Sequence, residues 1–161
     1  MKIYLDGCDG VGKSTLATYL SERFAIDKFC LTKDSEKSIG RYMDFKLDDV
    51  VYDRTFLSEV VYPEIFGREK RLSEKDIKFL LRWYSDNDTL FVICTAPDDE
   101  IKRRILARGV EHLEVIKNID VINNAYREIA KKYNLMIVNT HVHSNEEIGD
   151  MIERRLKNDK R

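Results

Sequence analysis

Five short apolar runs occur along the chain, and longer segments with apolar residues at helical spacing separate them. The runs are rich in Val, Ile, Leu and aromatic residues and almost continuously apolar, which is typical of strands covered on both faces. They predict strands at 2–6, 28–32, 49–53, 89–96 and 135–140. The intervening segments predict helices at 13–26, 35–46, 55–67, 73–86, 97–108, 111–134 and 144–158.

Three of the predicted helices carry recognisable starting signals. Ser73 precedes Asp76 by three residues and Ser144 precedes Glu147 by three, which is the spacing of a capping box. Pro97 stands in a first turn and acidic residues follow it. Strands that alternate with helices imply right-handed crossovers. We therefore expect an α/β fold with a five-stranded parallel sheet flanked by helices.

The composition indicates an ordinary globular protein with no strongly charged surface. The chain has 161 residues, the usual size of one domain, so we expect a single domain over 1–161. Its 28 basic and 29 acidic side chains nearly cancel, which argues against a broad surface for nucleic acid or anionic membrane. No apolar run approaches the roughly 20 residues that span a bilayer. Any affinity for phosphate must be local, and we expect no nucleic-acid and no membrane partner.

The cysteines favour a reducing compartment. Cys8, Cys30 and Cys94 are far apart and odd in number, which suits free thiols better than a disulfide framework. No basic region followed by an apolar signal stretch precedes the first predicted strand. We expect a cytoplasmic, unprocessed protein.

Three of the seven glycines lie within six positions, directly after the first predicted strand. Residues 7–14 read Gly-Cys-Asp-Gly-Val-Gly-Lys-Ser, the phosphate-loop (P-loop) pattern, between a strand and a helix as that pattern requires. Glycines let the backbone approach an anion, so that N–H groups converge on phosphate oxygens at a helix N-terminus. Lys13, facing the ligand crevice, would reach the outer phosphates, and Ser14 would offer a hydroxyl to Mg²⁺. The loop predicts a nucleoside triphosphate site formed by Gly7, Cys8, Asp9, Gly10, Val11, Gly12, Lys13, Ser14 and Thr15.

Several protein classes share this loop. The chain contains no Asn-Lys-x-Asp guanine reader, which disfavours a GTPase. A mechanical ATPase usually needs a longer chain for its second phosphate sensor. Small-molecule kinases and a small nucleotide-dependent switch protein stay open.

The segment VVYDRTFLSEVVYP, residues 50–63, discriminates further because its predicted strand ends in Asp53-Arg54-Thr55. At the carboxyl end of such a strand, side chains point into the ligand crevice. We expect Asp53 near the metal, directly or through a water. Arg54 would present a bidentate fork to a second phosphate. The alternative is that Asp53 and Thr55 cap the next helix while Arg54 is solvated.

The segments YLDGCDGVGKSTLATYL and VVYDRTFLSEVVYP together resemble the thymidylate kinase and deoxynucleoside kinase superfamily. In that family an acidic residue and Gly open the loop, a second acidic residue lies inside it, and an Asp-Arg motif follows the third strand. The segment TAPDDEIKRRILARG, residues 95–109, is similar to the one that leads to the family's lid. The resemblance implies a P-loop NTPase fold, ATP as phosphoryl donor, Mg²⁺ as cofactor, small nucleotide substrates and a homodimer.

The resemblance also implies roles for individual residues. Asp9 matches the in-loop carboxylate that contacts the acceptor sugar, and Arg54 matches the arginine that holds the acceptor phosphate. Tyr62 lies on the helix that borders the acceptor. Arg104 and Arg108 match lid arginines, and their spacing puts both on one helix face, where they could bracket the transferred group. A basic outer helix face is the alternative for these two arginines.

A set of candidate site residues follows from the motifs and the resemblance. It comprises the catalytic residues Lys13, Asp53, Arg54, Arg104 and Arg108, the acceptor-binding residues Asp9, Arg54 and Tyr62, and the metal ligands Ser14 and Asp53. Thymidylate kinases commonly have Tyr-Gln where this chain has Tyr62-Pro63, so the amide that reads thymine is missing. The acceptor base therefore stays open.

The motifs and the resemblance together predict ATP-dependent phosphoryl transfer to a (deoxy)nucleoside monophosphate, as in thymidylate kinases, and two alternatives remain. A deoxynucleoside kinase would need a carboxylate base, for which Asp34 and Glu36 are candidates. A nucleotide-dependent switch would hydrolyse slowly and act through a partner. Either way, we expect the loop at 139–144, which holds His141 and His143, to lie under the adenine.

Overall fold

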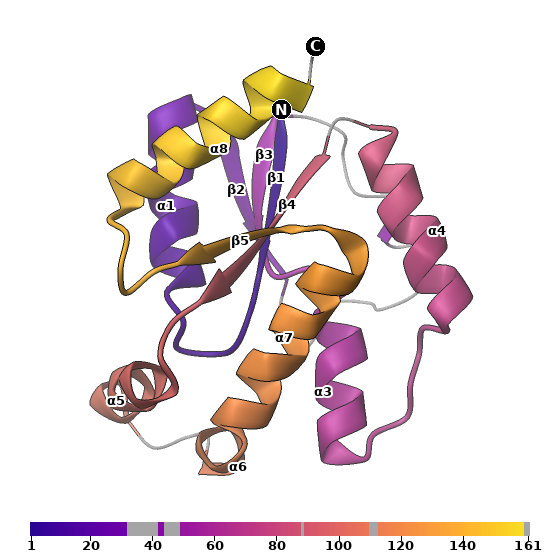
Figure 1. Cartoon of the computed structure of the whole chain (residues 1–161), viewed down its shortest axis with the longest axis vertical. Helices are drawn as coiled ribbons and strands as arrows, with labels where there is room; N and C mark the ends of the chain where they lie inside the picture. The colour runs from indigo at the N-terminus through magenta and orange to yellow at the C-terminus, as the bar shows by residue number, and fades with distance from the viewer. Residues whose placement is uncertain (32–41, 44–48, 88, 110–112, 160–161) are drawn as a thin grey trace.

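The computed structural model describes residues 1–31, 42–43, 49–87, 89–109 and 113–159. Its centre is one sheet with the strand order β2-β3-β1-β4-β5, in which all four pairings are parallel (Figure 1). The strands are β1 (Lys2–Asp6), β2 (Asp27–Cys30), β3 (Val50–Asp53), β4 (Thr89–Thr95) and β5 (Met136–Asn139). The predicted five-stranded parallel sheet is thus confirmed.

Helices cover both faces of the sheet. The described helices are α1 (Lys13–Phe24), α3 (Ser58–Phe66), α4 (Glu74–Ser85), α5 (Asp98–Ala107), α6 (Leu113–Lys117), α7 (Ile119–Tyr133) and α8 (Asn145–Asp159). Helices α1 and α8 lie on one side of the sheet, and α3, α4 and α7 lie on the other (Figure 1). The predicted helix at 35–46 lies largely outside the described residues. Only residues 42–43 of this range are described, and both are helical.

The predicted helix at 111–134 is wrong as a single element, because Asn118 divides it into α6 and α7. The Asn118 amide Nδ2 donates to the Glu114 carbonyl at 2.8 Å, and its backbone N–H donates to Val115 O at 3.1 Å. These bonds close the first helix, and Asn118 O then accepts the first bond of α7, from Ile122 N. A polar side chain that satisfies the backbone locally thus ends a helix that apolar spacing alone would continue.

Burial differs between the central and the outer strands. Every residue of β1 and β3 is buried, whereas all four residues of β2 are exposed and β5 buries only Val138. The expectation that all five strands are covered on both faces is therefore wrong for β2 and β5. Both lie at an edge of the sheet, where their apolar residues are covered less fully.

An aromatic cluster fills the core between the sheet and α4. Tyr4 of β1 stacks on Tyr52 of β3 with ring centroids 4.5 Å apart, and Tyr84 of α4 lies 4.8 Å from Tyr4. Phe56 stacks on Tyr84 at 5.8 Å and meets Phe91 edge to face. Phe56 is fully buried there, so it belongs to the core and not to a ligand surface.

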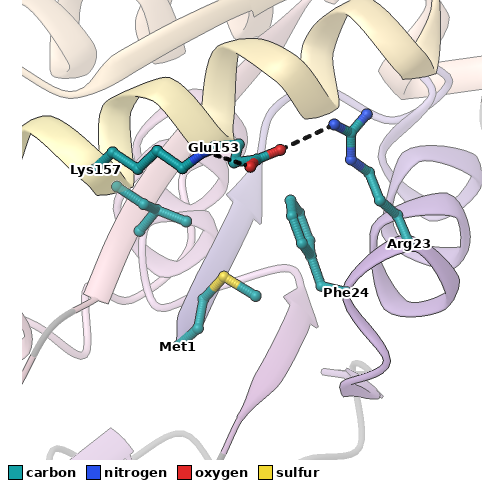
Figure 2. A pocket seen from close by; sticks show the side chains of 6 residues that line it. Met1, Arg23, Phe24, Glu153 and Lys157 are labelled. Carbon is teal, nitrogen blue, oxygen red and sulfur yellow. Dashed lines mark hydrogen bonds and ion pairs between the residues drawn. The ribbon is translucent and has the colours of Figure 1, made fainter.

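A hollow of about 400 Å³ lies where β1 begins, at the amino-terminal ends of the strands and opposite the glycine loop (Figure 2). Its charged side chains satisfy one another, because Glu153 accepts from Arg23 at 3.1 Å and from Lys157 at 2.7 Å. Phe24 and Met1 supply apolar lining. These contacts join α1 to α8 far from the strand ends at which ligands bind in such sheets. Among the described helices, none has the length and apolarity needed to cross a membrane.

The two capping boxes that the sequence predicts are confirmed. Ser73 Oγ accepts from Asp76 N at 3.3 Å, and Asp76 Oδ2 accepts from Ser73 N at 2.7 Å. Ser144 N donates to Glu147 Oε2 at 2.8 Å, and Glu147 N donates to Ser144 Oγ at 3.2 Å. Each box provides side-chain acceptors for backbone N–H groups that have no partner within the helix.

We expect Ser73→Ala to lower the free energy of unfolding by about 1 kcal/mol, because the Asp76 N–H loses its acceptor. Urea denaturation followed by circular dichroism measures this change. Ser73→Thr, which keeps the hydroxyl, is the matched control. Equal stability of the alanine and threonine variants would contradict the role of this cap.

Candidate active site

The glycine loop has a backbone that only glycine adopts without strain. Gly7 has φ +143° and Gly10 has φ +78°. A Cβ at Gly7 would lie 2.4 Å from the Cys94 carbonyl oxygen, and one at Gly10 would lie 2.5 Å from Ile105 Cγ1. The loop is therefore seated against β4 on one side and α5 on the other. Conformation and space both require glycine at these two positions.

Helix α1 begins directly after the loop. Its first backbone hydrogen bond runs from Leu16 N to Gly12 O at 3.1 Å, so the N–H groups before Leu16 have no partner within the helix. The side chains of Ser14 and Thr15 are exposed at this end. Free N–H groups and the helix dipole together favour an anion here.

Lys13 is buried, contrary to our expectation of a lysine exposed to the ligand crevice. Its side chain folds back under the loop, and Nζ donates to Gly7 O and to Cys8 O at 2.7 Å each. The ammonium group thus helps to hold the loop closed. An anion on the loop would compete with these two carbonyls for the same charge.

Asp53 ends β3 and is also buried, with 5% of its surface exposed. Within the part of the chain that the structure describes, its carboxylate has no hydrogen bond or ion pair. It caps no described helix, whereas Thr55 Oγ1 accepts from Leu57 N at 3.0 Å. The alternative of a helix cap does not describe Asp53, and Thr55 makes its bond in the turn before α3, whose N-cap residue Leu57 has no side-chain cap. The Asp53 oxygens keep some exposed surface, so water, a cation or another polar ligand can reach them.

The structure brings together the three predicted acceptor residues. Arg54 Nη2 forms an ion pair with Asp9 Oδ1. The Tyr62 hydroxyl donates to Asp9 Oδ2 and accepts from Asp9 N, both at 3.3 Å. The Arg54 guanidinium carbon lies 6.0 Å from the centroid of the Tyr62 ring. Arg54 is therefore a paired group, and the alternative of a solvated arginine does not describe it.

The two lid arginines do not converge. Arg104 Nη1 donates to Val11 O and to Thr140 Oγ1 at 3.1 Å each, and Arg104 Nε donates to Glu100 at 2.7 Å. Hydrogen bonds from Arg103 and Arg104 lower the pKa of Glu100 to about 2. Arg108 lies exposed at the end of α5, without a side-chain partner among the described residues. Only Arg104 reaches the loop, and it does so as a link to the β5–α8 connection.

The connection after β5 meets the glycine loop through Thr140. The Thr140 hydroxyl donates to the Val11 carbonyl, and Thr140 N donates to Thr95 O at 2.9 Å. His141 and His143 follow in the same connection, and no group of three or more metal-ligating residues occurs in the described parts of the chain. The 139–144 connection thus lies beside the phosphate loop, and its place under the adenine stays a prediction.

Sequence reasoning singled out no role for Asp6, although the acidic residue before the first glycine was part of the resemblance. Its carboxylate is completely buried and accepts hydrogen bonds from Gly7, Thr55 and Ser58. It therefore joins the two segments that carry the candidate site. The available signal was an acidic residue at the end of an otherwise apolar strand.

Comparison with known proteins places these features among nucleotide kinases. No family model matches the chain. The SPbeta prophage-derived uncharacterized protein YorR of Bacillus subtilis is 30% identical over 137 residues, which cover 79% of this chain and 80% of YorR. A probable thymidylate kinase of Methanocaldococcus jannaschii is 24% identical over an alignment of 190 positions, covering 98% of this chain and 96% of the relative.

Solved structures agree with these relatives. The crystal structure of Bacillus subtilis YorR in complex with phosphorylated GDP matches with a TM-score of 0.80 at 27% identity, covering 98% of this chain and 96% of YorR. Deoxyadenosine kinase from M. mycoides, with dCMP and dCDP bound, matches with a TM-score of 0.64 at 18% identity, covering 98% and 99%. The latter likeness concerns the fold alone.

The burial of the three cysteines predicts which of them a thiol reagent will modify. Cys8 and Cys94 are fully buried, and burial raises the pKa of Cys8 to about 11 and that of Cys94 to about 12. At pH 8 roughly one Cys8 in a thousand would be a thiolate, the reactive form. We expect Ellman's reagent to modify one thiol of the native protein, the exposed Cys30. The other two should react only after unfolding.

Peptide mass mapping of the modified protein identifies the labelled residue, and Cys30→Ser is the control that should lose the reaction. Rapid modification of Cys8 in the native protein would contradict the buried position of this side chain within the glycine loop.

Proposed function

The chain belongs to the P-loop nucleotide kinases that include thymidylate and deoxynucleoside kinases, and we propose that it transfers the γ-phosphoryl group of ATP to a nucleoside monophosphate. The observation that carries the proposal is the Arg54 guanidinium, held beside the glycine loop by Asp9 and Tyr62. A fixed arginine fork next to a phosphate loop suits a second phosphate.

The donor side of the site consists of the glycine loop and the start of α1. Its N–H groups and the Lys13 ammonium suit the phosphates of ATP. The residues present also fit Mg²⁺, because the Ser14 hydroxyl is exposed at the loop and the buried Asp53 carboxylate has no partner among the described residues. Oxygen ligands of this kind are those that Mg²⁺ prefers, directly or through water. When bound, the ion neutralises charge on the phosphates.

The acceptor side centres on Arg54. An acceptor phosphate would take the guanidinium in bidentate geometry and compete with the Asp9 carboxylate for it. Asp9 would then be free to accept a hydrogen bond from a sugar hydroxyl. Burial raises the pKa of Tyr62, so its hydroxyl stays protonated and continues to donate at neutral pH.

Phosphoryl transfer requires positioning and charge stabilisation more than covalent chemistry. An acceptor phosphate oxygen is already ionised, so this reaction needs no general base. Arg104 would support the transfer by fixing the Val11 carbonyl of the loop. The direct role of Arg104 and Arg108 on the transferred group remains a prediction. A nucleoside acceptor would need a base, and the candidates Asp34 and Glu36 lie outside the described residues.

The proposal extends to the setting of the enzyme. The resemblance supports one kinase domain over residues 1–161 that acts as a cytoplasmic homodimer on small nucleotides. The proposal does not specify the nucleobase of the acceptor, because Pro63 stands where relatives of the thymidylate kinase type carry an amide.

The acceptor class is tested by ADP release from ATP with a panel of deoxynucleoside monophosphates and the corresponding nucleosides. We expect turnover at least about tenfold faster with the monophosphates. Arg54→Ala should raise the acceptor KM at least about tenfold and leave the ATP KM nearly unchanged, since the lost contact is to the acceptor. Arg54→Lys, which keeps the charge without the fork, should be intermediate.

Faster turnover of the nucleosides would reassign the chain as a deoxynucleoside kinase. Lack of stimulation by either set of acceptors would favour a nucleotide-dependent switch. An unchanged acceptor KM in Arg54→Ala would remove the acceptor phosphate from this position.

Lys13→Ala should reduce turnover by about a hundredfold or more, because the loop loses its charge for the outer phosphates. It should also lower the melting temperature of the free protein, since Gly7 O and Cys8 O lose their shared donor. Differential scanning fluorimetry with and without ATP–Mg²⁺ separates the two effects. Lys28→Ala, an exposed lysine on β2, is the matched control. Turnover of Lys13→Ala within tenfold of the parent would refute a catalytic P-loop.

A further inference from the structure

Asp6 is a fully buried carboxylate that ends β1, and its hydrogen-bond partners among the described residues are all donors from the site. Its Oδ1 accepts from Gly7 N at 2.9 Å and from Ser58 Oγ at 3.1 Å. Its Oδ2 accepts from Thr55 N at 3.1 Å and from Thr55 Oγ1 at 2.6 Å. Buried charges persist only where such bonds replace the lost water. One side chain thus contacts the first peptide of the glycine loop and the turn that follows β3.

The turn that follows β3 is strained at Arg54. This residue has φ +78°, a left-handed conformation that a bulky side chain rarely adopts. The end of β1 holds the turn from both sides, because Arg54 N donates to Leu5 O at 2.9 Å and the next N–H, that of Thr55, donates to Asp6. Strain of this kind persists where the surroundings over-determine it, and it gathers at functional sites.

The direction of the Arg54 side chain depends on this turn. In its left-handed conformation Arg54 reaches Asp9 within the glycine loop, rather than continuing the strand direction of β3. The other oxygen of Asp6 holds the peptide at which the same loop begins. Asp6 therefore links the backbone of the phosphate loop to the turn that carries Arg54, in addition to the direct ion pair between Arg54 and Asp9.

We propose that Asp6 is a positioning residue that holds Arg54 in its strained conformation and fixes the guanidinium relative to the glycine loop, and so aligns acceptor with donor. This inference rests on the proposed function of Arg54 as the acceptor-phosphate ligand. Asp6 itself touches neither nucleotide. It acts through the Thr55 and Gly7 peptides, and Ser58 extends the same network to Tyr126 of α7, whose hydroxyl donates to Ser58 Oγ at 3.3 Å.

A carboxylate suits this position better than an amide of equal size. Two ionised oxygens can accept from all of the surrounding donors. Asparagine offers one acceptor oxygen and presents an NH₂ group to the others, so either the Gly7 or the Thr55 N–H loses its bond. Asp6→Asn therefore preserves volume while it breaks the link between the loop and the Arg54 turn.

A double-mutant cycle tests the proposal, with Asp6→Asn, Arg54→Ala and the double variant compared by kcat/KM for the acceptor. We expect Asp6→Asn alone to lower this constant at least about tenfold, mainly through acceptor KM, with ATP KM changed less than about threefold. In the Arg54→Ala background the same substitution should cost less than about threefold, because the group through which it acts is gone. Equal losses in both backgrounds would overturn the proposal and leave Asp6 a role in stability only.

A second variant keeps the test decisive if Asp6→Asn does not fold. Thr55→Val keeps the shape and removes one donor to Asp6 together with the acceptor of the Leu57 N–H, so it should raise acceptor KM and show the same non-additivity with Arg54→Ala. Thr95→Val is the matched control, since it removes another buried hydroxyl, one that donates to Val138 O, away from Asp6. An equal rise of acceptor KM in both valine variants would refute the specific link.

The cycle also separates this inference from the proposed function. If Arg54→Ala leaves acceptor KM unchanged, the acceptor assignment fails whatever Asp6 does. If Arg54→Ala raises acceptor KM but the effects of the two sites multiply independently, the proposed function stands and the role of Asp6 fails.

Discussion

The parallel pairing of the strands is the constraint from which the candidate site follows. The carboxyl ends of parallel strands lie on the same side of the sheet. Here the register sets Leu5 beside Asp53 and Thr95 beside Asn139. The glycine loop leaves the central strand on that side. The Arg54 turn approaches it from β3, and the Thr140 connection approaches it from β5. Groups far apart in the sequence thus contact the same loop because a shared hydrogen-bond ladder brings their strands to a common end.

The site handles charge locally in a chain with almost no net charge. Three described cations near the loop already have protein partners: Lys13 has loop carbonyls, Arg54 has Asp9, and Arg104 has Glu100 and the Val11 carbonyl. Such pairing keeps buried charges tolerable before a ligand arrives. A nucleotide must therefore exchange contacts with the protein, and its net affinity reflects the difference between two sets of bonds.

Patterns of local sequence were sufficient for much of the fold and for the position of the site. The sheet, the P-loop, both capping boxes and the grouping of Asp9, Arg54 and Tyr62 follow from apolar runs, motif spacing or resemblance. The break at Asn118 does not, because it depends on one side-chain hydrogen bond and not on periodicity. The burial of Lys13 and the partners of Arg104 do not either, since they depend on contacts with Gly7, Val11 and Thr140 whose geometry exists only in the folded protein.

The packing of the glycine loop against β4 has a consequence for folding during translation. Gly7 packs against the Cys94 carbonyl, and β1 pairs on its two sides with β3 and β4, both of which lie much later in the chain. During synthesis the loop sequence leaves the ribosome before β4, the strand it packs against, which follows α3 and α4 in the chain. The nascent chain therefore carries β1 without its β4 partner until residue 95 has been made, although β3 is available from residue 53. Such non-local pairing slows folding and leaves an open strand edge exposed to aggregation until β4 arrives.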